Sequence, residues 1–297
     1  MTGPGTNTYL VGDDEVTVID PGPADPAHVD AIVTAVGEGR IRWILLTHTH
    51  PDHWPAAVPL AARTGAPIVA YARRERGLRI DRPLGDGDAV EAPDHRLVAL
   101  HTPGHAPNHL CFRLEGERAL FTGDNVLDGM WSVISPDRGG DMATYLTSLA
   151  RMRAERAAWL APAHGHVIPD ADTRIDEYLQ HRRDREHQIH RCLHHEPMTI
   201  VGVVARLYPD LPAPLVPVAR RQVHAHLRKL RDGAVKGINI AGTLRNARSF
   251  LSGGAGGGDK SETKTGSSAE KTDFSELTAS FAIKDGVVSS EIGRAHV

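Results

Sequence analysis

The segment from Thr47 to Pro55 constrains the fold of this chain more than any other. It reads Thr-His-Thr-His-Pro-Asp-His-Trp-Pro and follows directly on the apolar run Trp43-Ile44-Leu45-Leu46. Because that run is short and continuous, it predicts a buried strand. A strand that leads into three histidines and an aspartate is a candidate metal site. The spacing of these side chains suits two metal ions close together, which is typical of hydrolytic centres.

Three later segments repeat this pattern. Leu97 to Leu100 leads to His105, Ala119 to Phe121 leads to Asp124, and Trp159 to Ala161 leads to His164. Each segment is a short apolar run that predicts a strand. Unrelated surface histidines have no reason to fall repeatedly at strand ends, so this recurrence supports the candidate metal site.

Helices are predicted between the strands. Asp25 has the position of an N-cap, Pro26 that of a first helical residue, and Gly37 that of a C-terminal stop, so residues 26–36 predict a helix. The Ala-rich segment 56–64, which precedes Gly65, predicts a second one. Alternating strands and helices indicate an α/β layered fold.

Length and composition set broad limits. With 297 residues and 40% hydrophobic content, the chain can bury a sizeable core. Its formal net charge of -3 gives no overall attraction to nucleic acid or anionic membranes. Cys111 and Cys192 do not make a disulfide framework. The first residues lack the features of a signal peptide and no apolar run has transmembrane length, so we expect a cytoplasmic protein without a membrane partner.

The series of polar tips resembles that of the metallo-β-lactamase superfamily: H-x-H-x-D-H, then a later His, Asp and His. The resemblance covers about Gly3 to Asp170 and implies an αββα sandwich with metals at one rim. The segments Gly3-Pro4-Gly5-Thr6-Asn7-Thr8-Tyr9-Leu10, Thr102-Pro103-Gly104-His105 and Gly140-Asp141-Met142 resemble the subgroup that includes the mitochondrial β-lactamase-like endoribonuclease. In that subgroup the sheet begins further upstream, so we expect the N-terminal strand to be truncated here.

The resemblance also implies a ligand set, position by position. It assigns to the first metal His48, His50 and His105, to the second Asp52, His53 and His164, and to the bridge between them Asp124. Imidazole and carboxylate ligands without thiolate favour two zinc ions, with manganese or iron as alternatives. A water bridging the metals would have its pKa lowered toward ~7 and supply hydroxide at neutral pH. The candidate catalytic residues are Asp124, as the bridge between the metals, and Asp52, which could also orient that hydroxide.

Other polar residues near the ligands receive weaker assignments. Asp20 follows the apolar run Val16-Thr17-Val18-Ile19, which predicts a strand, and is a candidate hydrogen-bond partner for a ligand imidazole. His101, His109 and His166 lie beside ligands in the sequence. We expect them to have structural roles, with protonation of a leaving group as the alternative.

Three helices are predicted after the hydrolase-like region, at residues 172–195, 198–208 and 215–232. They suit a small winged-helix-like appendage, which the subgroup also carries. The third helix places Arg220, Arg228 and Arg231 on one stripe that could contact RNA phosphates, although a solvated face is the plainer interpretation. We expect a metal hydrolase domain at 1–170 and the helical appendage at 171–235.

Residues 236–297 differ in character from the rest. Gly253 to Glu270 is low-complexity Gly/Ser/Lys sequence that cannot bury a core. Leu277 to Val288 predicts an isolated strand with nothing to pair with, and residues 236 to about 290 resemble a segment of the AsmA family. We expect this tail to be foreign to the fold.

Three functions compete. The subgroup resemblance favours a phosphodiesterase that cuts single-stranded RNA with a metal-bound hydroxide. A thioesterase or other acyl hydrolase of the glyoxalase II (hydroxyacylglutathione hydrolase) kind is the alternative, because the same two metals cleave carbonyl esters. A non-catalytic nucleic-acid-binding module is a further alternative, which the complete ligand set argues against. The expected substrate is therefore a small ester or single-stranded RNA.

Overall fold

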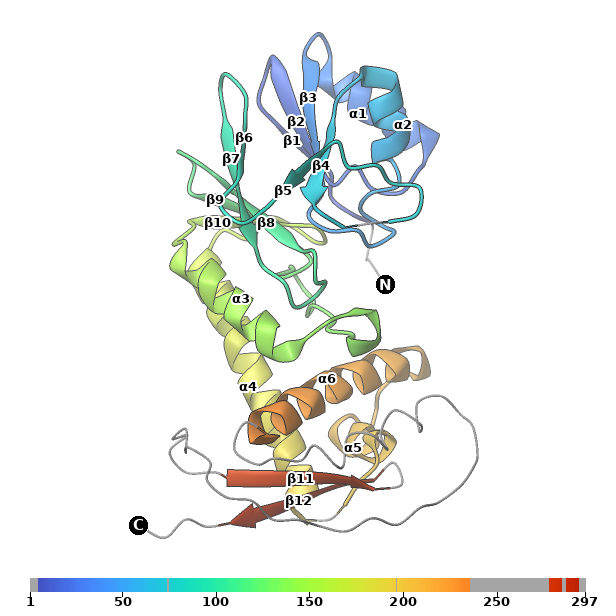
Figure 1. Cartoon of the computed structure of the whole chain (residues 1–297), viewed down its shortest axis with the longest axis vertical. Coiled ribbons are helices and arrows are strands. Elements are labelled where there is room, and N and C mark those ends of the chain that lie inside the picture. The colour runs from blue at the N-terminus through green and yellow to red at the C-terminus, as the bar shows by residue number, and fades with distance from the viewer. Residues whose placement is uncertain (1–4, 74, 196, 236–277, 285–286, 294–297) are drawn as a thin grey trace, which may run out of the picture. The chain divides into compact units, whose positions relative to one another are not determined.

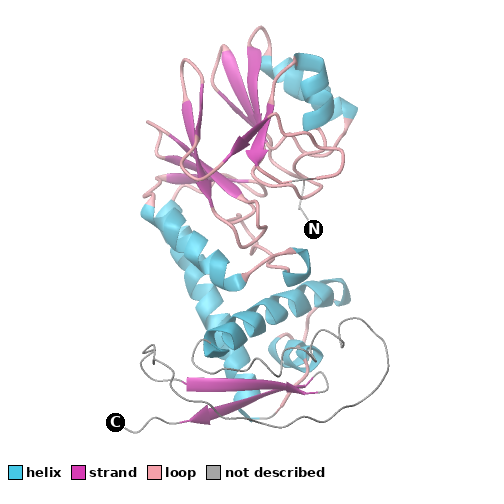
Figure 2. Ribbon diagram, viewed as in Figure 1, coloured by secondary structure: helices cyan, strands magenta, loops and turns pink. Residues whose placement is uncertain are grey.

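The computed structural model describes residues 5–73, 75–195, 197–235, 278–284 and 287–293. The chain divides into two compact units, Met1–Arg182 and Arg183–Val297. Among the described residues, no helix is both long and apolar enough to cross a membrane. Figures 1 and 2 show the elements of each unit.

The first unit contains two mixed five-stranded sheets. The first sheet has the order β1-β2-β3-β4-β5, with bounds β1 Tyr9–Val11, β2 Glu15–Ile19, β3 Arg40–Leu45, β4 Ile68–Tyr71 and β5 Arg82–Leu84. Only the β1–β2 pair in it is antiparallel. The second sheet has the order β10-β9-β8-β7-β6, with bounds β6 Ala89–Glu91, β7 Arg96–His101, β8 Leu110–Leu114, β9 Ala119–Gly123 and β10 Trp159–Pro162. Only its β9–β10 pair is parallel.

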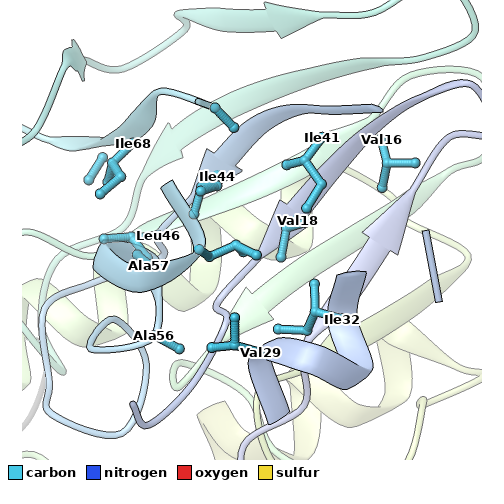
Figure 3. Close-up of a cluster of buried hydrophobic side chains, with 13 residues drawn as sticks. Val16, Val18, Val29, Ile32, Ile41, Ile44, Leu46, Ala56, Ala57 and Ile68 are labelled. Carbon is cyan, nitrogen blue, oxygen red and sulfur yellow. The ribbon is translucent and has the colours of Figure 1, made fainter. Parts of the chain in front are cut away.

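Helices α1 (Pro26–Val36) and α2 (Ala57–Thr64) cover the outer face of the first sheet. Side chains alternate across the strands, because successive residues of a strand point to opposite faces. In β3, Ile44 packs with α1 and α2, whereas Leu45 packs against the second sheet. Figure 3 shows the cluster of buried hydrophobic side chains to which Ile44 belongs, between the first sheet and helices α1 and α2.

Helix α3 (Met142–Ala154) lies on the other side of the second sheet, where the Sδ of Met152 is 3.9 Å from the Sγ of Cys111 in β8. The order of layers is therefore helix, sheet, sheet, helix, which confirms the expected αββα sandwich. A short 3₁₀ helix, η1 (Pro136–Arg138), precedes α3.

Local sequence signals explain where α1 begins and ends. The Asp25 side chain accepts a hydrogen bond from the backbone N–H of Ala27, Pro26 opens the helix, and Gly37 follows its last residue with a φ of 64°. These are the preferred residues at such positions. The prediction for residues 26–36 is confirmed.

The two compact units divide inside helix α4 (Ala171–His195), after Arg182, whereas the sequence places the predicted domain boundary before this helix. The reason is that the first turns of α4 bury Ile175, Tyr178 and Arg182 in the first unit. A long helix with a thin apolar stripe gives no signal of where its packing partner changes.

The second unit contains the rest of α4, then α5 (Ile200–Leu207), a 3₁₀ helix η2 (Ala213–Leu215) and α6 (Val216–Val235). Its core includes Ile189, Val203 and Val223, one from each of the three helices. Three helices were predicted here, and the structure contains all three.

Strands β11 (Thr278–Lys284) and β12 (Val287–Gly293) form an antiparallel pair. The prediction of an isolated strand at 277–288 is therefore wrong, because the residues after 286 supply the partner. The low-complexity segment 253–270 lies outside the described residues.

Candidate metal centre

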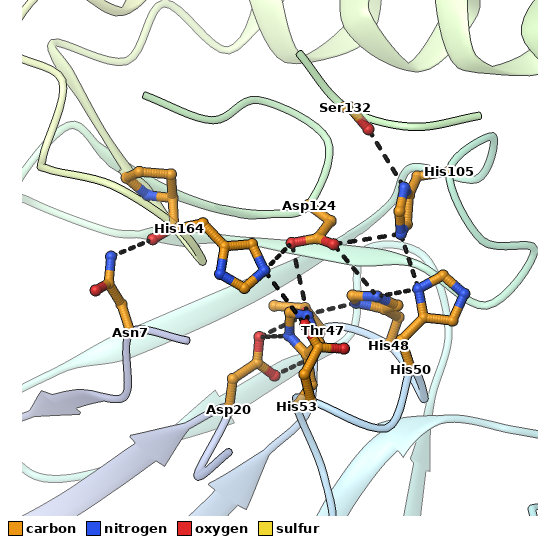
Figure 4. A network of polar contacts seen from close by, with 12 residues as sticks. Asn7, Asp20, Thr47, His48, His50, His53, His105, Asp124, Ser132 and His164 are labelled. Carbon is orange, nitrogen blue, oxygen red and sulfur yellow. Dashed lines mark hydrogen bonds and ion pairs between the residues drawn. The ribbon is translucent and has the colours of Figure 1, made fainter. Parts of the chain in front are cut away.

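The polar tips meet at one edge of the two sheets (Figure 4). Strands β2 and β3 are parallel, so the segments after them start at the same edge. In the second sheet β7 and β9 both run antiparallel to β8, and β10 runs parallel to β9. The carboxyl ends of β7, β9 and β10 therefore also share an edge. This topology brings together the four segments that carry the proposed ligands, which follow β3, β7, β9 and β10.

Three imidazoles form the first group of ligand atoms. His50 Nδ1 lies 2.9 Å from the Nε2 of His48 and 2.9 Å from the Nε2 of His105. Asp124 Oδ2 is 3.4 Å from His105 Nε2 and 4.0 Å from His48 Nε2. These four atoms all lie within 4.8 Å of one another, which is close enough to surround one metal ion.

The second group lies on the other side of Asp124. Asp52 Oδ2 is 3.5 Å from His53 Nε2 and 3.4 Å from His164 Nε2. Asp124 Oδ1 is 3.6 Å from His53 Nε2 and 3.2 Å from His164 Nε2. The two oxygens of Asp124 thus face different groups, as a carboxylate that bridges two cations does. The cluster is compatible with a binuclear metal site.

Buried polar atoms test whether the cluster fits metal ions. His53 Nε2 and Asp124 Oδ1 are buried without a hydrogen-bond partner among the described residues. Leaving such atoms unpaired costs about 1–3 kcal/mol each. A cation between them would satisfy both, and imidazole with carboxylate is a usual donor set for divalent metals. The residues present therefore fit the pair of metal ions that the sequence implied.

Two glycines let the ligands approach. Gly123 precedes Asp124 with a φ of 48°, and a Cβ there would lie 2.6 Å from His109 Nε2. Gly104 precedes His105 with a φ of 134°, and a Cβ there would lie 2.3 Å from the Cα of Tyr145. Only glycine avoids both the clash and the unfavourable backbone conformation at these positions.

The Asp20 side chain fixes both ends of the segment Thr47 to His53, which carries four of the proposed ligands. Its carboxylate accepts hydrogen bonds from His53 Nδ1 at 2.9 Å, from the Thr47 backbone N–H at 2.8 Å and from the Thr47 hydroxyl at 2.6 Å. Asp20 adopts a φ of 49°, which is unusual for a residue other than glycine. The expected contact between Asp20 and a ligand imidazole is present, and it points His53 Nε2 into the cluster.

Other imidazoles are oriented by backbone carbonyls. His105 Nδ1 donates to the Val133 carbonyl at 2.9 Å, and His164 Nδ1 donates to the Gly5 carbonyl at 2.9 Å. Backbone oxygens give no sequence signal, so these contacts were not foreseen. Each one leaves Nε2 as the atom that faces the cluster, which is how proteins commonly orient metal-binding histidines.

Burial and neighbouring charges shift the pKa values of the cluster in opposite directions. Burial, together with the other histidines, lowers the pKa of His50 to about 4 and that of His48 well below its usual range. For His164, burial lowers the pKa, but the neighbouring carboxylates of Asp124 and Asp52 raise it to about 10. Burial opposes ionisation of Asp124, yet His53 and His164 hold its pKa well below normal. These directions favour an ionised Asp124 and neutral His48 and His50, the forms that bind metal, whereas His164 has to release a proton when a metal binds.

The three other histidines beside the ligands differ in their surroundings. His109 is buried, and its Nε2 accepts a hydrogen bond from the Asp124 backbone N–H at 3.1 Å. His101 stacks on Tyr71 with 4.3 Å between ring centroids. His166 has a 95% exposed side chain that pairs with Asp128. His109 thus positions Asp124, whereas His101 and His166 make their contacts elsewhere.

Helix α6 in the second unit carries the three arginines of the predicted stripe. Arg220 is exposed, and Arg228 and Arg231 are partly exposed. The Nη2 of Arg231 lies 2.8 Å from Asp232 Oδ1. One of the three charges is therefore already paired.

Comparison with known proteins gives two family matches. Residues 1–164 match the model of the metallo-beta-lactamase superfamily, and residues 199–236 match that of the beta-lactamase associated winged helix domain. A metallo-beta-lactamase family protein from Thermus thermophilus has a similar fold, with a TM-score of 0.65 and 24% identity over 77% of this chain and 89% of its own.

Two curated relatives illustrate the sequence similarity. The "Beta-lactamase-like protein 2 homolog" of Caenorhabditis elegans is 32% identical over 243 residues, which cover 78% of this chain and 81% of that protein. The "Atrochrysone carboxyl ACP thioesterase dmxR1" of a Cryptosporiopsis species is 35% identical over 192 residues, which cover 64% of this chain and 58% of that protein. The chain spans 57–60% of the length of this thioesterase and of several fungal relatives named lactamase-like proteins. On its fold, its cluster and these matches, the chain belongs to the metallo-beta-lactamase superfamily of hydrolases and carries a beta-lactamase-associated winged helix domain.

Proposed function

We propose that the protein hydrolyses acyl thioesters, with two zinc ions held by the seven-residue cluster. In this proposal His48, His50 and His105 would hold one ion, Asp52, His53 and His164 would hold the other, and Asp124 would serve both groups. When bound, the ions would lower the pKa of a water molecule toward neutrality and stabilise the negative charge that develops on the substrate. Zinc is preferred because imidazole and carboxylate suit it, while manganese and iron accept similar donors.

The residues around the ions have separate tasks. Asp124 is 12% exposed and Asp52 is 31% exposed, so Asp52 is the carboxylate that faces solvent. We assign to Asp52 the orientation of the attacking water. Asp20 and His109 hold His53 and Asp124 in place through the hydrogen bonds described above.

The observation that favours a thioester is the placement of the histidines beside the ligands. Protonating a leaving group requires an acid that faces the cluster, and neither His101 nor His166 does so. Burial lowers the pKa of His109 well below its usual range, and its Nε2 already accepts a hydrogen bond. A thiolate leaves without protonation because thiols have a pKa of about 8.5, whereas an alkoxide is a far stronger base.

The relative named as an acyl carrier protein thioesterase supports the same substrate class. Its similarity extends over the part of the chain that holds the cluster. The RNA phosphodiesterase function has weaker support. The observation in its favour is the stripe on α6, where Arg220 is exposed, Arg228 is partly exposed and Arg231 is paired.

The test compares leaving groups on one acyl chain. Zinc-loaded protein is assayed with an acyl-coenzyme A thioester, the matching oxygen ester and a single-stranded RNA, with Asp124→Asn as the inactive control. We expect kcat/KM to be highest for the thioester. Equal rates on the thioester and the oxygen ester would contradict the argument that the three described histidines beside the ligands supply no acid, and faster cleavage of RNA would favour the phosphodiesterase.

A further inference from the structure

The acceptor that orients His105 lies in an irregular segment. Residues 127–133 form no helix or strand, yet Ser132 is fully buried. The Val133 carbonyl accepts the hydrogen bond from His105 Nδ1, and the Ser132 hydroxyl lies 3.3 Å from the same nitrogen. An irregular segment does not pair its own backbone groups in a regular way, so its buried carbonyls depend on partners from elsewhere.

One face of α4 supplies those partners. Arg174, Tyr178 and Arg182 are spaced four residues apart, so they lie on one side of the helix. Arg174 donates to the Leu127 carbonyl at 2.9 Å and to the Met130 carbonyl at 3.2 Å. Tyr178 donates to the Met130 carbonyl at 2.7 Å, and Arg182 donates to the Ser132 carbonyl at 2.5 Å.

Arg182 stands out in this group because it is buried. Its residue is 2% exposed, and its guanidinium lies over the ring of Tyr145 at 5.3 Å. Burying a cation is costly unless its N–H groups are hydrogen bonded. One such bond is made to the Ser132 carbonyl, which is one residue before the carbonyl that orients His105.

We propose that Arg182 is a positioning residue for the metal centre. By holding the Ser132 carbonyl it fixes the peptide that follows, and this keeps the Val133 carbonyl in place for His105 Nδ1. His105 Nε2 then faces His50 and Asp124 in the first group of ligands. The proposal rests on the two-metal centre proposed above and does not depend on the substrate.

The test measures zinc affinity in the full chain. Arg182→Met removes the donors at similar volume, Arg182→Lys retains one cationic donor, and Arg183→Met is the matched control, because Arg183 is its exposed neighbour on the same helix. Zinc is titrated in competition with a chelating dye. We expect Arg182→Met to lower the affinity for one of the two zinc ions by about 10–100-fold, which is the usual effect of removing a residue that orients a ligand. Arg182→Lys should recover part of this loss, and Arg183→Met should bind as the wild type does.

A second readout follows the hydrogen bond itself. In zinc-free protein labelled with ¹⁵N-histidine, the Nδ1–H signal of His105 should exchange faster with water in Arg182→Met than in the wild type. Two zinc ions bound with wild-type affinity by Arg182→Met would overturn the proposal. Equal weakening of both ions with a lower Tm would also overturn it, because that would show a packing role.

If Arg182→Met does not fold, Tyr178→Phe is used instead to test the positioning role of this face of α4. It removes only the hydroxyl that donates to Met130 and Leu127 carbonyls and accepts from the Leu127 N–H. We expect it to weaken the same zinc ion by a smaller factor, whereas unchanged binding of both ions would contradict the role of this helix face. Loss of zinc affinity without any thioesterase activity in the wild type would support the positioning role and reject the proposed substrate, so the two failures are distinguishable.

Discussion

Asp124 connects the two halves of the candidate centre at the scale of single residues. Its two oxygens face separate groups of ligands, and its backbone N–H donates to His109. Gly123 before it leaves room for His109, so the backbone and the side chain are both fixed. The centre is therefore built by residues that hold ligands as much as by the ligands.

Asp20 provides a test of that interpretation. Asp20→Asn retains the size of the side chain, and asparagine tolerates a positive φ, but the amide cannot accept both the His53 and Thr47 hydrogen bonds through two charged oxygens. We expect zinc affinity to fall by about 10–100-fold, with the loss on the ion that His53 contacts. Isothermal titration with zinc checks this. Wild-type affinity would show that Asp20 serves the fold alone.

The side chains of the centre were predictable from the sequence, as was the support from Asp20, but the other supports were not. The spacing of His48, His50, Asp52 and His53 after a strand, and the later strand ends, indicated which residues would meet. The carbonyls of Gly5 and Val133 could not be foreseen, because any residue type has a backbone oxygen. The role of Arg182 depends on a contact across 50 residues of sequence, which no local pattern reveals.

At the scale of elements, the length of a helix or strand determined whether the sequence predicted it. The long helices and the strands with continuous apolar runs appear close to their predicted bounds. Strands β5 and β6 were missed, since each has three residues and carries no periodic pattern. Helix α4 was predicted, but the point where its packing changes from one unit to the other was not.

The second unit contains a partly buried ion cluster that holds α4 to α6. Glu186 Oε1 lies 2.6 Å from Lys229 Nζ, and its Oε2 lies 3.4 Å from His226 Nδ1. The Glu186 side chain is 18% exposed and His226 is fully buried. Burial raises the pKa of Glu186, but His226 and Lys229 outweigh this effect and lower it.

Replacing Glu186 should therefore destabilise this unit in a pH-dependent way. Because its folded pKa is depressed, the carboxylate stabilises the fold above its unfolded pKa of about 4.3, and this contribution is lost as the pH falls through the lower folded value. We expect Glu186→Gln to reduce the free energy of unfolding by about 1–3 kcal/mol near neutral pH and by progressively less in acid. Urea unfolding monitored by circular dichroism measures the difference.

Asp232→Asn is the matched control, because Asp232 pairs with Arg231 at the surface with 53% of its side chain exposed. Exposed pairs contribute little to stability. A destabilisation by Glu186→Gln that does not change with pH would contradict the ionic explanation.

At the scale of the whole molecule, charge is unevenly distributed along the chain. Residues 183–235 contain nine Arg or Lys and five Asp or Glu, while the chain as a whole has a formal net charge of -3. Such a basic region can attract a polyanion without the metal centre taking part. The stripe on α6 is the part of it that the sequence singled out.

Substituting Arg220, Arg228 and Arg231 together by Gln separates the two candidate functions. If the region binds single-stranded RNA, affinity should fall and its dependence on salt should flatten, by about one unit of slope for each phosphate that is no longer neutralised. Turnover of a small acyl thioester should not change, because the ligands are untouched. Binding that is unchanged at every salt concentration would remove RNA contact from this surface.

Metal content tests the central claim most directly. Full-length protein purified without chelators, loaded with zinc and freed of excess metal is analysed for metal per chain, beside His50→Ala and Asp124→Asn. We predict about two zinc ions in the wild type, because two groups of ligand atoms share one carboxylate, and fewer in both variants with the fold retained. One ion or none in the folded wild-type protein would contradict a binuclear centre.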